Sequence, residues 1–224
     1  KCNSTSLTVL DISDNHELKI LECNYTALNS MDTSNNPKLQ TLKLNGTNIS
    51  TLNISHNPLL SSLDVSSCNY LEDVNLGNNR YITSLTISDY GSNSSTPKRD
   101  VKVVGSNLTN LKCNGQTINS VDLSQLSNLK SLEISNENGT IDNLDLSRLP
   151  KLSSLYIDYC NSIENIDLSN NKELKVFRYV GSSDGSAHGL VQEIDFSNNL
   201  ELQNVEFKGV PPKGNWLGDF PYWG

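Results

Sequence analysis

One pattern recurs along almost the whole chain and constrains what it can fold into. Two variable residues separate the first apolar residue from the second, and one variable residue separates the second from the third. The next copy begins 10 to 12 residues further along the chain, except at two insertions. Examples are Leu39-Leu42-Leu44, Ile49-Leu52-Ile54 and Leu60-Leu63-Val65. A unit this short cannot bury its own leucines, so the copies must stack on one another.

The copies are of two kinds that alternate, so the true period is 21 to 23 residues. One kind carries Asp-x-Ser, as at Asp167 and Asp195, and the other kind varies at the same position. Alternate side chains of a strand point to opposite faces, which predicts short strands with the apolar pair inside and parallel sheets between coils. An amide side chain in the turn after Asp-x-Ser can satisfy open backbone groups and bridge successive turns. Most coils have an asparagine there, and two have leucine: Asn15, Asn36, Asn57, Asn79, Asn171 and Asn199, with Leu126 and Leu149.

The segment Leu18-Lys19-Ile20-Leu21-Glu22-Cys23, with Leu28 after it, resembles the leucine-rich repeat in its short bacterial, internalin-like form. The family's asparagine position holds Thr26 here and Thr47 in the next coil, which departs from the family pattern. The periodicity predicts a mainly β solenoid of about nine to ten coils, with short parallel strands on both the concave and convex faces and little or no α-helix. The resemblance implies a secreted or cell-surface protein, with any signal peptide upstream.

The pattern predicts a solenoid over residues 1–208, insertions at 88–100 and 180–189, and an aromatic and proline-rich cap or tail at 209–224. Lys1-Cys2-Asn3 aligns with Glu22-Cys23-Asn24, so we expect the chain to begin inside a repeat. The five cysteines lack CxxC spacing and are expected to be buried thiols.

Composition and motifs exclude several functions. The net charge of -8 gives no electrostatic footprint for nucleic acid or anionic lipid, and no apolar run approaches the roughly 20 residues that span a bilayer. We expect no cofactor and no metal, and interpret the Asp-x-Ser column as hydrogen-bonded rather than as a calcium site. Gly181–Gly185 matches G-x-S-x-G near His188, but without the strand-to-helix context of a nucleophile. The chain is therefore not predicted to be an enzyme.

The resemblance implies a binding module that holds a protein or glycan with its concave face. The residues themselves show nearly constant convex strands and variable concave ones, with larger groups gathering late in the chain. Tyrosine and arginine are favoured interface anchors, so the predicted ligand-binding residues are Glu133, Tyr156, Asp158 and Arg178. Two alternatives remain: a structural spacer of a larger surface protein, and a polysaccharide-active β-helix enzyme.

Overall fold

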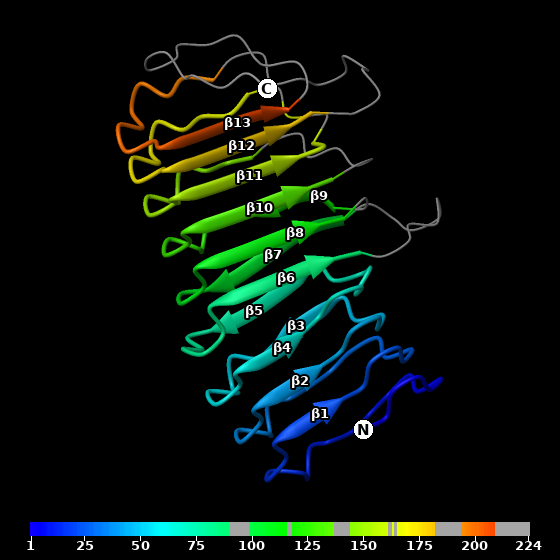
Figure 1. Ribbon diagram of the computed structural model, residues 1–224. Coiled ribbons are helices and arrows are strands. Elements are labelled where there is room, and N and C mark those ends of the chain that lie inside the picture. The colour runs from blue at the N-terminus through cyan, green and yellow to red at the C-terminus, as the bar shows by residue number, and fades with distance from the viewer. Residues whose placement is uncertain are drawn as a thin grey trace.

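The chain winds into a β-solenoid whose strands run parallel to one another (Figure 1). This computed structural model describes residues 1–89, 99–115, 118–136, 144–160, 163, 165–181 and 194–208. None of these residues is helical. The predicted fold class, a mainly β solenoid of stacked parallel strands, is confirmed. The predicted tail at 209–224 and most of the insertion at 180–189 lie outside the described residues.

The strands on the side facing the viewer in Figure 1 are called the front face; they are the strands predicted to be concave. They form one sheet of three strands and one of six. The smaller sheet contains β1 (Ile20–Glu22), β2 (Thr41–Lys43) and β4 (Ser62–Asp64). The larger contains β6 (Ser84–Ser88), β8 (Asn110–Asn114), β10 (Ser131–Ser135), β11 (Ser154–Asp158), β12 (Val176–Val180) and β13 (Asn204–Lys208). The longest continuous stack thus has six strands, which is lower than the predicted nine to ten coils.

The opposite, or back, face carries a shorter sheet of four parallel strands. These are β3 (Thr51–Asn53), β5 (Asp73–Gly77), β7 (Arg99–Gly105) and β9 (Ile118–Asp122). Strands therefore occur on both faces, but in the described part of the chain the back-face strands are confined to the central coils. There β7, with seven residues, provides a long ladder for its two neighbours.

The Asp-x-Ser column forms a series of identical local turns on the back face. In each, the serine backbone N–H donates to the Oδ1 atom of the aspartate two residues earlier, at 2.9 Å for Asp145 and Asp167. Asn53 makes the same bond to Ser55 at 3.0 Å without a charge. The hydrogen bonds from Ser169 lower the pKa of Asp167 below its ordinary value of 3.8. Among the described residues, no group of three or more His, Cys, Asp or Glu could hold a metal.

Buried asparagines connect successive coils, as the sequence predicts. The Nδ2 atom of Asn36 donates to the carbonyl oxygens of Ile12 at 3.0 Å and of Asn15 at 2.9 Å. Asn57 repeats this one coil later and donates to the carbonyl oxygen of Asn36 at 2.9 Å. Both side chains lie inside one continuous apolar core. Each asparagine thus adds a second hydrogen bond to carbonyl oxygens that already accept one from a backbone N–H of their own turn, as the carbonyl oxygen of Ile12 does from Asn15. Leu126 and Leu149 at the equivalent positions are buried as well.

A buried ion pair closes the ends of the predicted insertion at 88–100. Ser88 ends β6 and Arg99 begins β7, while residues 90–98 lie outside the described ranges. The Nη1 atom of Arg99 lies 3.3 Å from Oδ2 of Asp89, and each side chain is 2% exposed. Arg99 also donates to the carbonyl oxygens of Leu71 at 3.0 Å and of Asn69 at 2.8 Å. The two ends of the insertion are therefore integral to the core.

The cysteines pack as thiols. None of the five forms a disulfide; four are buried and Cys2 is partly buried. Burial raises the pKa of the Cys113 thiol to about 12. Cys2 stacks directly on Cys23, with their Sγ atoms 2.7 Å apart. The expectation of thiols that pack as small apolar side chains is confirmed for the four buried residues.

Adjacent asparagines give a matched test of the asparagine stack. Asn36→Ala removes the two hydrogen bonds that the amide donates to the carbonyl oxygens of Ile12 and Asn15, which keep their bonds from backbone N–H groups, so the free energy of unfolding should fall by about 1–3 kcal/mol. Asn35→Ala alters an exposed side chain in the same turn and should change it by no more than about 0.5 kcal/mol. Urea denaturation, monitored by circular dichroism, measures the change in unfolding free energy for both variants. Equal losses in the two variants would show that the buried amide has no special role.

Candidate functional site

Three of the predicted site residues are brought into one line across the front face. Glu133 on β10 pairs with Tyr156 on β11, and Tyr156 pairs with Arg178 on β12. Their side chains point outward, because the residues on either side of each fill the core, as Leu155 and Ile157 do around Tyr156. Asp158 lies two residues beyond Tyr156 on the same face of β11. The structure thus brings together all four residues that the sequence singled out.

Arg178 is the centre of this group. Its Nη2 atom lies 2.5 Å from Oδ2 of Asp158, and its guanidinium lies 6.0 Å from the centre of the Tyr156 ring. The side chain of Arg178 is 36% exposed, whereas that of Asp158 is 10% exposed. Burial raises the pKa of Asp158, and the positive charge of Arg178 opposes that rise. The pair therefore consists of a largely sheltered carboxylate and a guanidinium that is still accessible from the front.

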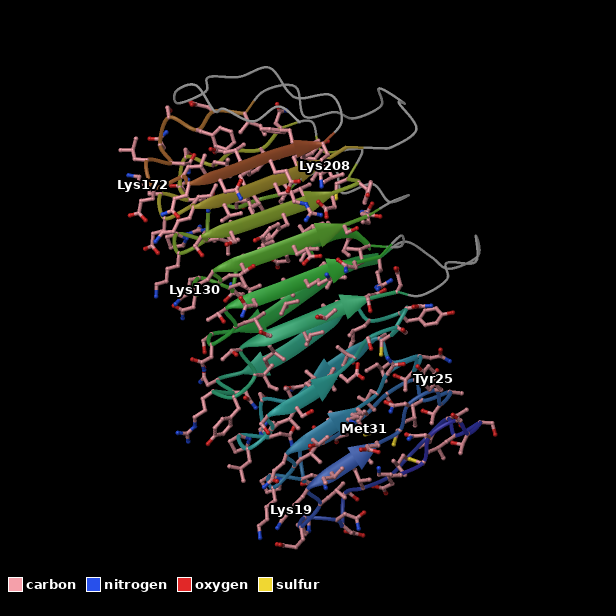
Figure 2. All side chains as sticks on the ribbon, viewed as in Figure 1. Lys19, Tyr25, Met31, Lys130, Lys172 and Lys208 are labelled. Carbon is pink, nitrogen blue, oxygen red and sulfur yellow. The ribbon has the colours of Figure 1, made fainter. Side chains whose placement is uncertain are left out.

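Ion pairs extend the line in both directions to residues that the sequence prediction left out. Lys112 on β8 contacts Glu133, and Glu206 on β13 lies 3.9 Å from Nε of Arg178. Lys208 pairs with Glu206 at 2.9 Å and appears on the front of the last strand in Figure 2. The sequence does contain a signal for these residues, since opposite charges recur in the same outward columns one coil apart. The seven residues are called the front strip: Lys112, Glu133, Tyr156, Asp158, Arg178, Glu206 and Lys208.

The front strip carries three positive and three negative side chains, so it is neutral in a chain whose net charge is -8. Alternating charge of this kind gives orientation and partner discrimination more than long-range attraction. Two buried polar atoms within the strip, Oδ1 of Asp158 and Nε of Arg178, form no hydrogen bond with any described residue. Its interactions are therefore incompletely satisfied within the chain.

The interior beneath the last two strands of the strip, β12 and β13, is aromatic, whereas leucine and isoleucine lie beneath β10 and β11. Phe177 packs against Phe196 with ring centres 5.3 Å apart, and against Phe207 at 5.7 Å. Tyr179 lies 6.4 Å from Phe207. Large rings held in a close-packed layer fix the strands above them. The outward side chains of β12 and β13 thus stand on strands that a close-packed aromatic layer holds in place.

The described residues contain no further feature that assigns chemistry to this face. None of them forms a helix long and apolar enough to cross a membrane. Of the G-x-S-x-G segment only Gly181 is described; residues 182–185 and His188 lie outside the described ranges. The candidate site is accordingly a surface of paired charges around one tyrosine.

The repeat, and a solenoid without helix among the described residues, are consistent with an internalin-like leucine-rich repeat protein. Two internalin structures are similar to this chain. The functional domain of InlJ from Listeria monocytogenes, which includes a cysteine ladder, matches with a TM-score of 0.49 and 20% sequence identity, over 96% of this chain and 54% of that one. Internalin C2 of L. monocytogenes strain 4b F2365 matches with a TM-score of 0.38 and 19% identity, over 92% of this chain and 80% of that one.

This chain therefore spans about half the length of the InlJ domain that it matches. No family model matches the sequence, and no curated protein matches it. The structural likeness carries no information about what this chain binds.

The Arg178–Asp158 pair makes a prediction about stability and pH. Arg178→Ala removes the charge that opposes the effect of burial, so the pKa of Asp158 should rise further. When folding raises the pKa of a carboxyl group, the protonated group does not oppose folding. As the pH rises through the folded-state pKa, the group ionises and destabilises the fold. The variant should lose about 1–3 kcal/mol of unfolding free energy near pH 7 and much less near pH 4. Urea denaturation at the two pH values measures the difference.

The control is the double variant Arg178→Ala/Asp158→Asn, which has no carboxylate to leave unpaired. It should recover part of the lost stability near pH 7 and show little dependence on pH over this range. A single variant that is equally destabilised at both pH values, with no recovery in the double variant, would contradict the assigned role of the pair.

Proposed function

We propose that this chain is a non-catalytic binding module that recognises a protein partner through the front strip. The observation that carries the proposal is the alignment of Glu133, Tyr156 and Arg178 across three neighbouring strands. Tyrosine and arginine are the residue types that most often dominate interface energetics. Because the sheet already fixes their positions, little ordering cost remains for association.

The contrast between the two faces supports this proposal. On the back face, the recurring aspartates are used locally, since each accepts a hydrogen bond from the serine two residues later. On the front face, the outward side chains differ from strand to strand, while the backbone ladder beneath them is uniform. Folding thus places few demands on the outward front residues, and they are free to serve recognition.

The chemistry of the strip favours a protein over a glycan as its partner. It carries charges of both signs, and a protein surface can present complementary charges in the same alternation. The guanidinium of Arg178, whose side chain is 36% exposed, can still bind an acceptor of the partner. Secretion or display on a cell surface is the compartment that the repeat type implies, and it remains part of this proposal.

A polysaccharide-active enzyme is less well supported by the geometry. Such an enzyme needs acidic and basic groups gathered around one point, whereas the cations Lys112 and Arg178 are separated by β10 and β11. Each cation is also engaged with its own carboxylate. A spacer role makes the opposite prediction from a binding module, because it requires no surface of this chain to bind a ligand.

The test is the double variant Tyr156→Ala/Arg178→Ala, and the chain offers a matched control. Arg80 lies 5.6 Å from the ring centre of Tyr81 in a turn outside the strip, so Arg80→Ala/Tyr81→Ala removes a similar pair elsewhere. A panel of purified extracellular proteins is first screened for partners. The affinity of each variant for a captured partner is then measured by surface plasmon resonance. The strip variant should weaken binding at least about tenfold, and the control should bind as the unmodified chain does.

Equal binding by both variants would remove the strip as the binding surface. Failure of every protein in the panel to bind the unmodified chain would instead favour the spacer alternative. Circular dichroism of each variant verifies that the solenoid is intact, so that a loss of binding is not a loss of fold.

A further inference from the structure

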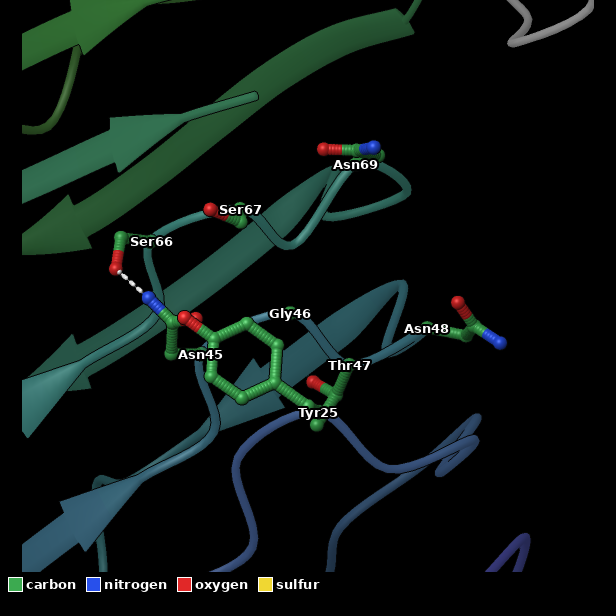
Figure 3. Close-up of a pocket in the computed structure, with 8 residues that line it drawn as sticks. All are labelled: Tyr25, Asn45, Gly46, Thr47, Asn48, Ser66, Ser67 and Asn69. Atoms are coloured by element: carbon green, nitrogen blue, oxygen red, sulfur yellow. Dashed lines mark hydrogen bonds between the residues drawn. The ribbon is translucent and has the colours of Figure 1, made fainter. Parts of the chain in front are cut away.

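A hollow of about 550 Å³ lies at the edge of the solenoid, beside the turns that follow β1, β2 and β4 (Figure 3). Figure 2 shows Tyr25 at the edge opposite Lys130 and Lys172. The hollow lies at the three-stranded sheet, whereas the front strip lies on the six-stranded sheet, so the two sites share no residue. Its volume is in the range, about 300–1,000 Å³, of sites that hold small ligands.

Tyr25 forms an aromatic wall of this hollow. Its side chain is 63% exposed, although a ring of this size is usually at least half-buried. The ring lies against Gly46, where a Cβ atom would come within 2.6 Å of its Cδ1 atom. Glycine at this position therefore permits the ring to lie close over the neighbouring turn. The backbone of Tyr25 has a positive φ of 54°, a conformation that costs energy for a non-glycine residue.

The rest of the lining is polar but uncharged. All eight residues around the hollow are tyrosine, asparagine, glycine, threonine or serine, in a chain of which 19% is charged. The Oδ1 atoms of Asn45 and Asn69 accept no hydrogen bond from any described residue. Both oxygens are buried, so the groups that the hollow offers to a ligand are the exposed ring of Tyr25, the amide of Asn48 and the hydroxyl group of Ser67, and none of these lining groups is charged.

Hydrogen bonds between coils hold these groups in place. The amide of Asn45 donates to Oγ of Ser66, the bond drawn in Figure 3. The backbone N–H of Tyr25 donates to the carbonyl oxygen of Asn45 at 2.7 Å, and that of Gly46 donates to the carbonyl oxygen of Ser66 at 2.9 Å. The third turn is anchored from the core, because Nη1 of Arg99 donates to the carbonyl oxygen of Asn69 at 2.8 Å. The hollow is therefore built before any ligand arrives.

We infer that this hollow is a binding site for a neutral saccharide of one or two hexose units. The C–H groups on one face of a hexose ring can pack on the electron-rich face of Tyr25. Its hydroxyl groups can exchange hydrogen bonds with the exposed amide of Asn48 and with the partly exposed hydroxyl group of Ser67. A hexose combines a face of C–H groups with a rim of hydroxyl groups and carries no charge, which matches the ring and the uncharged polar groups of the hollow.

The charge of the chain disfavours acidic saccharides as ligands of the hollow. None of the described residues that line the hollow is lysine or arginine, and the net charge of the chain is -8. Acidic saccharides such as sialic acid and uronic acids find no counter-charge there and are repelled by the chain as a whole. The site is therefore specific for uncharged sugars, and it is independent of the proposed protein-binding strip.

The inference is tested by titrating the unmodified chain with a panel of saccharides and detecting binding by saturation-transfer NMR. The panel contains glucose, galactose, mannose, N-acetylglucosamine and their common disaccharides, with sialic acid and glucuronic acid as acidic counterparts. At least one neutral sugar should bind with a dissociation constant no weaker than about 10 mM, which is a typical strength for so small a contact. The acidic sugars should not bind.

Three variants locate the site. Tyr25→Ala should lower the affinity for the sugar about 3- to 10-fold, whereas Tyr25→Phe should keep the ring contact and most of the affinity. Tyr81→Ala removes another exposed tyrosine, 49% exposed, and should have no effect. The strip variant Tyr156→Ala/Arg178→Ala should bind the sugar normally even if it loses its protein partner.

Two outcomes would overturn the inference. One is the absence of binding by every neutral sugar in the panel. The other is sugar binding that survives Tyr25→Ala unchanged, which would place the site elsewhere on the molecule. Neither outcome bears on the front strip, so failure here and failure of the proposed function can be told apart.

Discussion

A coil of this chain has no interior of its own, and everything else in the structure depends on that fact. Its leucines become buried only when the next coil stacks on them, and the backbone N–H groups of one coil find their acceptors on the next. Stacking in register thus satisfies the apolar and the polar requirement together. The buried amide of Asn36 belongs to the same solution, because it donates to carbonyl oxygens of the preceding coil.

This constraint acts on the inside and on the turns, and it leaves the outward front positions free. The aspartates of the back face are committed to their turns, whereas the side chains of Tyr156 and Arg178 project outward from the ladder that their backbones form. Insertions must also respect the stack. Arg99 and Asp89, at the ends of one insertion, are tied into the core by a buried ion pair and backbone acceptors. The front strands β6 and β8 on either side of the insertion pair without a register shift, whereas β7 on the back face has a shift against each of its neighbours.

The sequence predicted those features that depend on periodicity. The spacing of Leu132 and Leu155 defined the inward positions, and their strands pair as expected. It also placed Glu133, Tyr156 and Arg178 in one column. It could not predict features that depend on a single side-chain conformation: the shelter of Asp158, the ion pair inside the insertion, or the ring of Tyr25 over Gly46. These arise from contacts between coils at positions where the repeat itself varies.

Hydrogen–deuterium exchange of the whole chain, resolved to single amides by NMR, tests the stacked register most directly. If the coils are held by one continuous ladder, the amides of the central front strands β8, β10 and β11 should exchange slowest and with similar free energies of opening. Protection should decrease toward the first described coils, where β1 pairs on one side with β2 alone. Amides of β10 and β11 that exchange as fast as those of an unfolded chain would contradict the account.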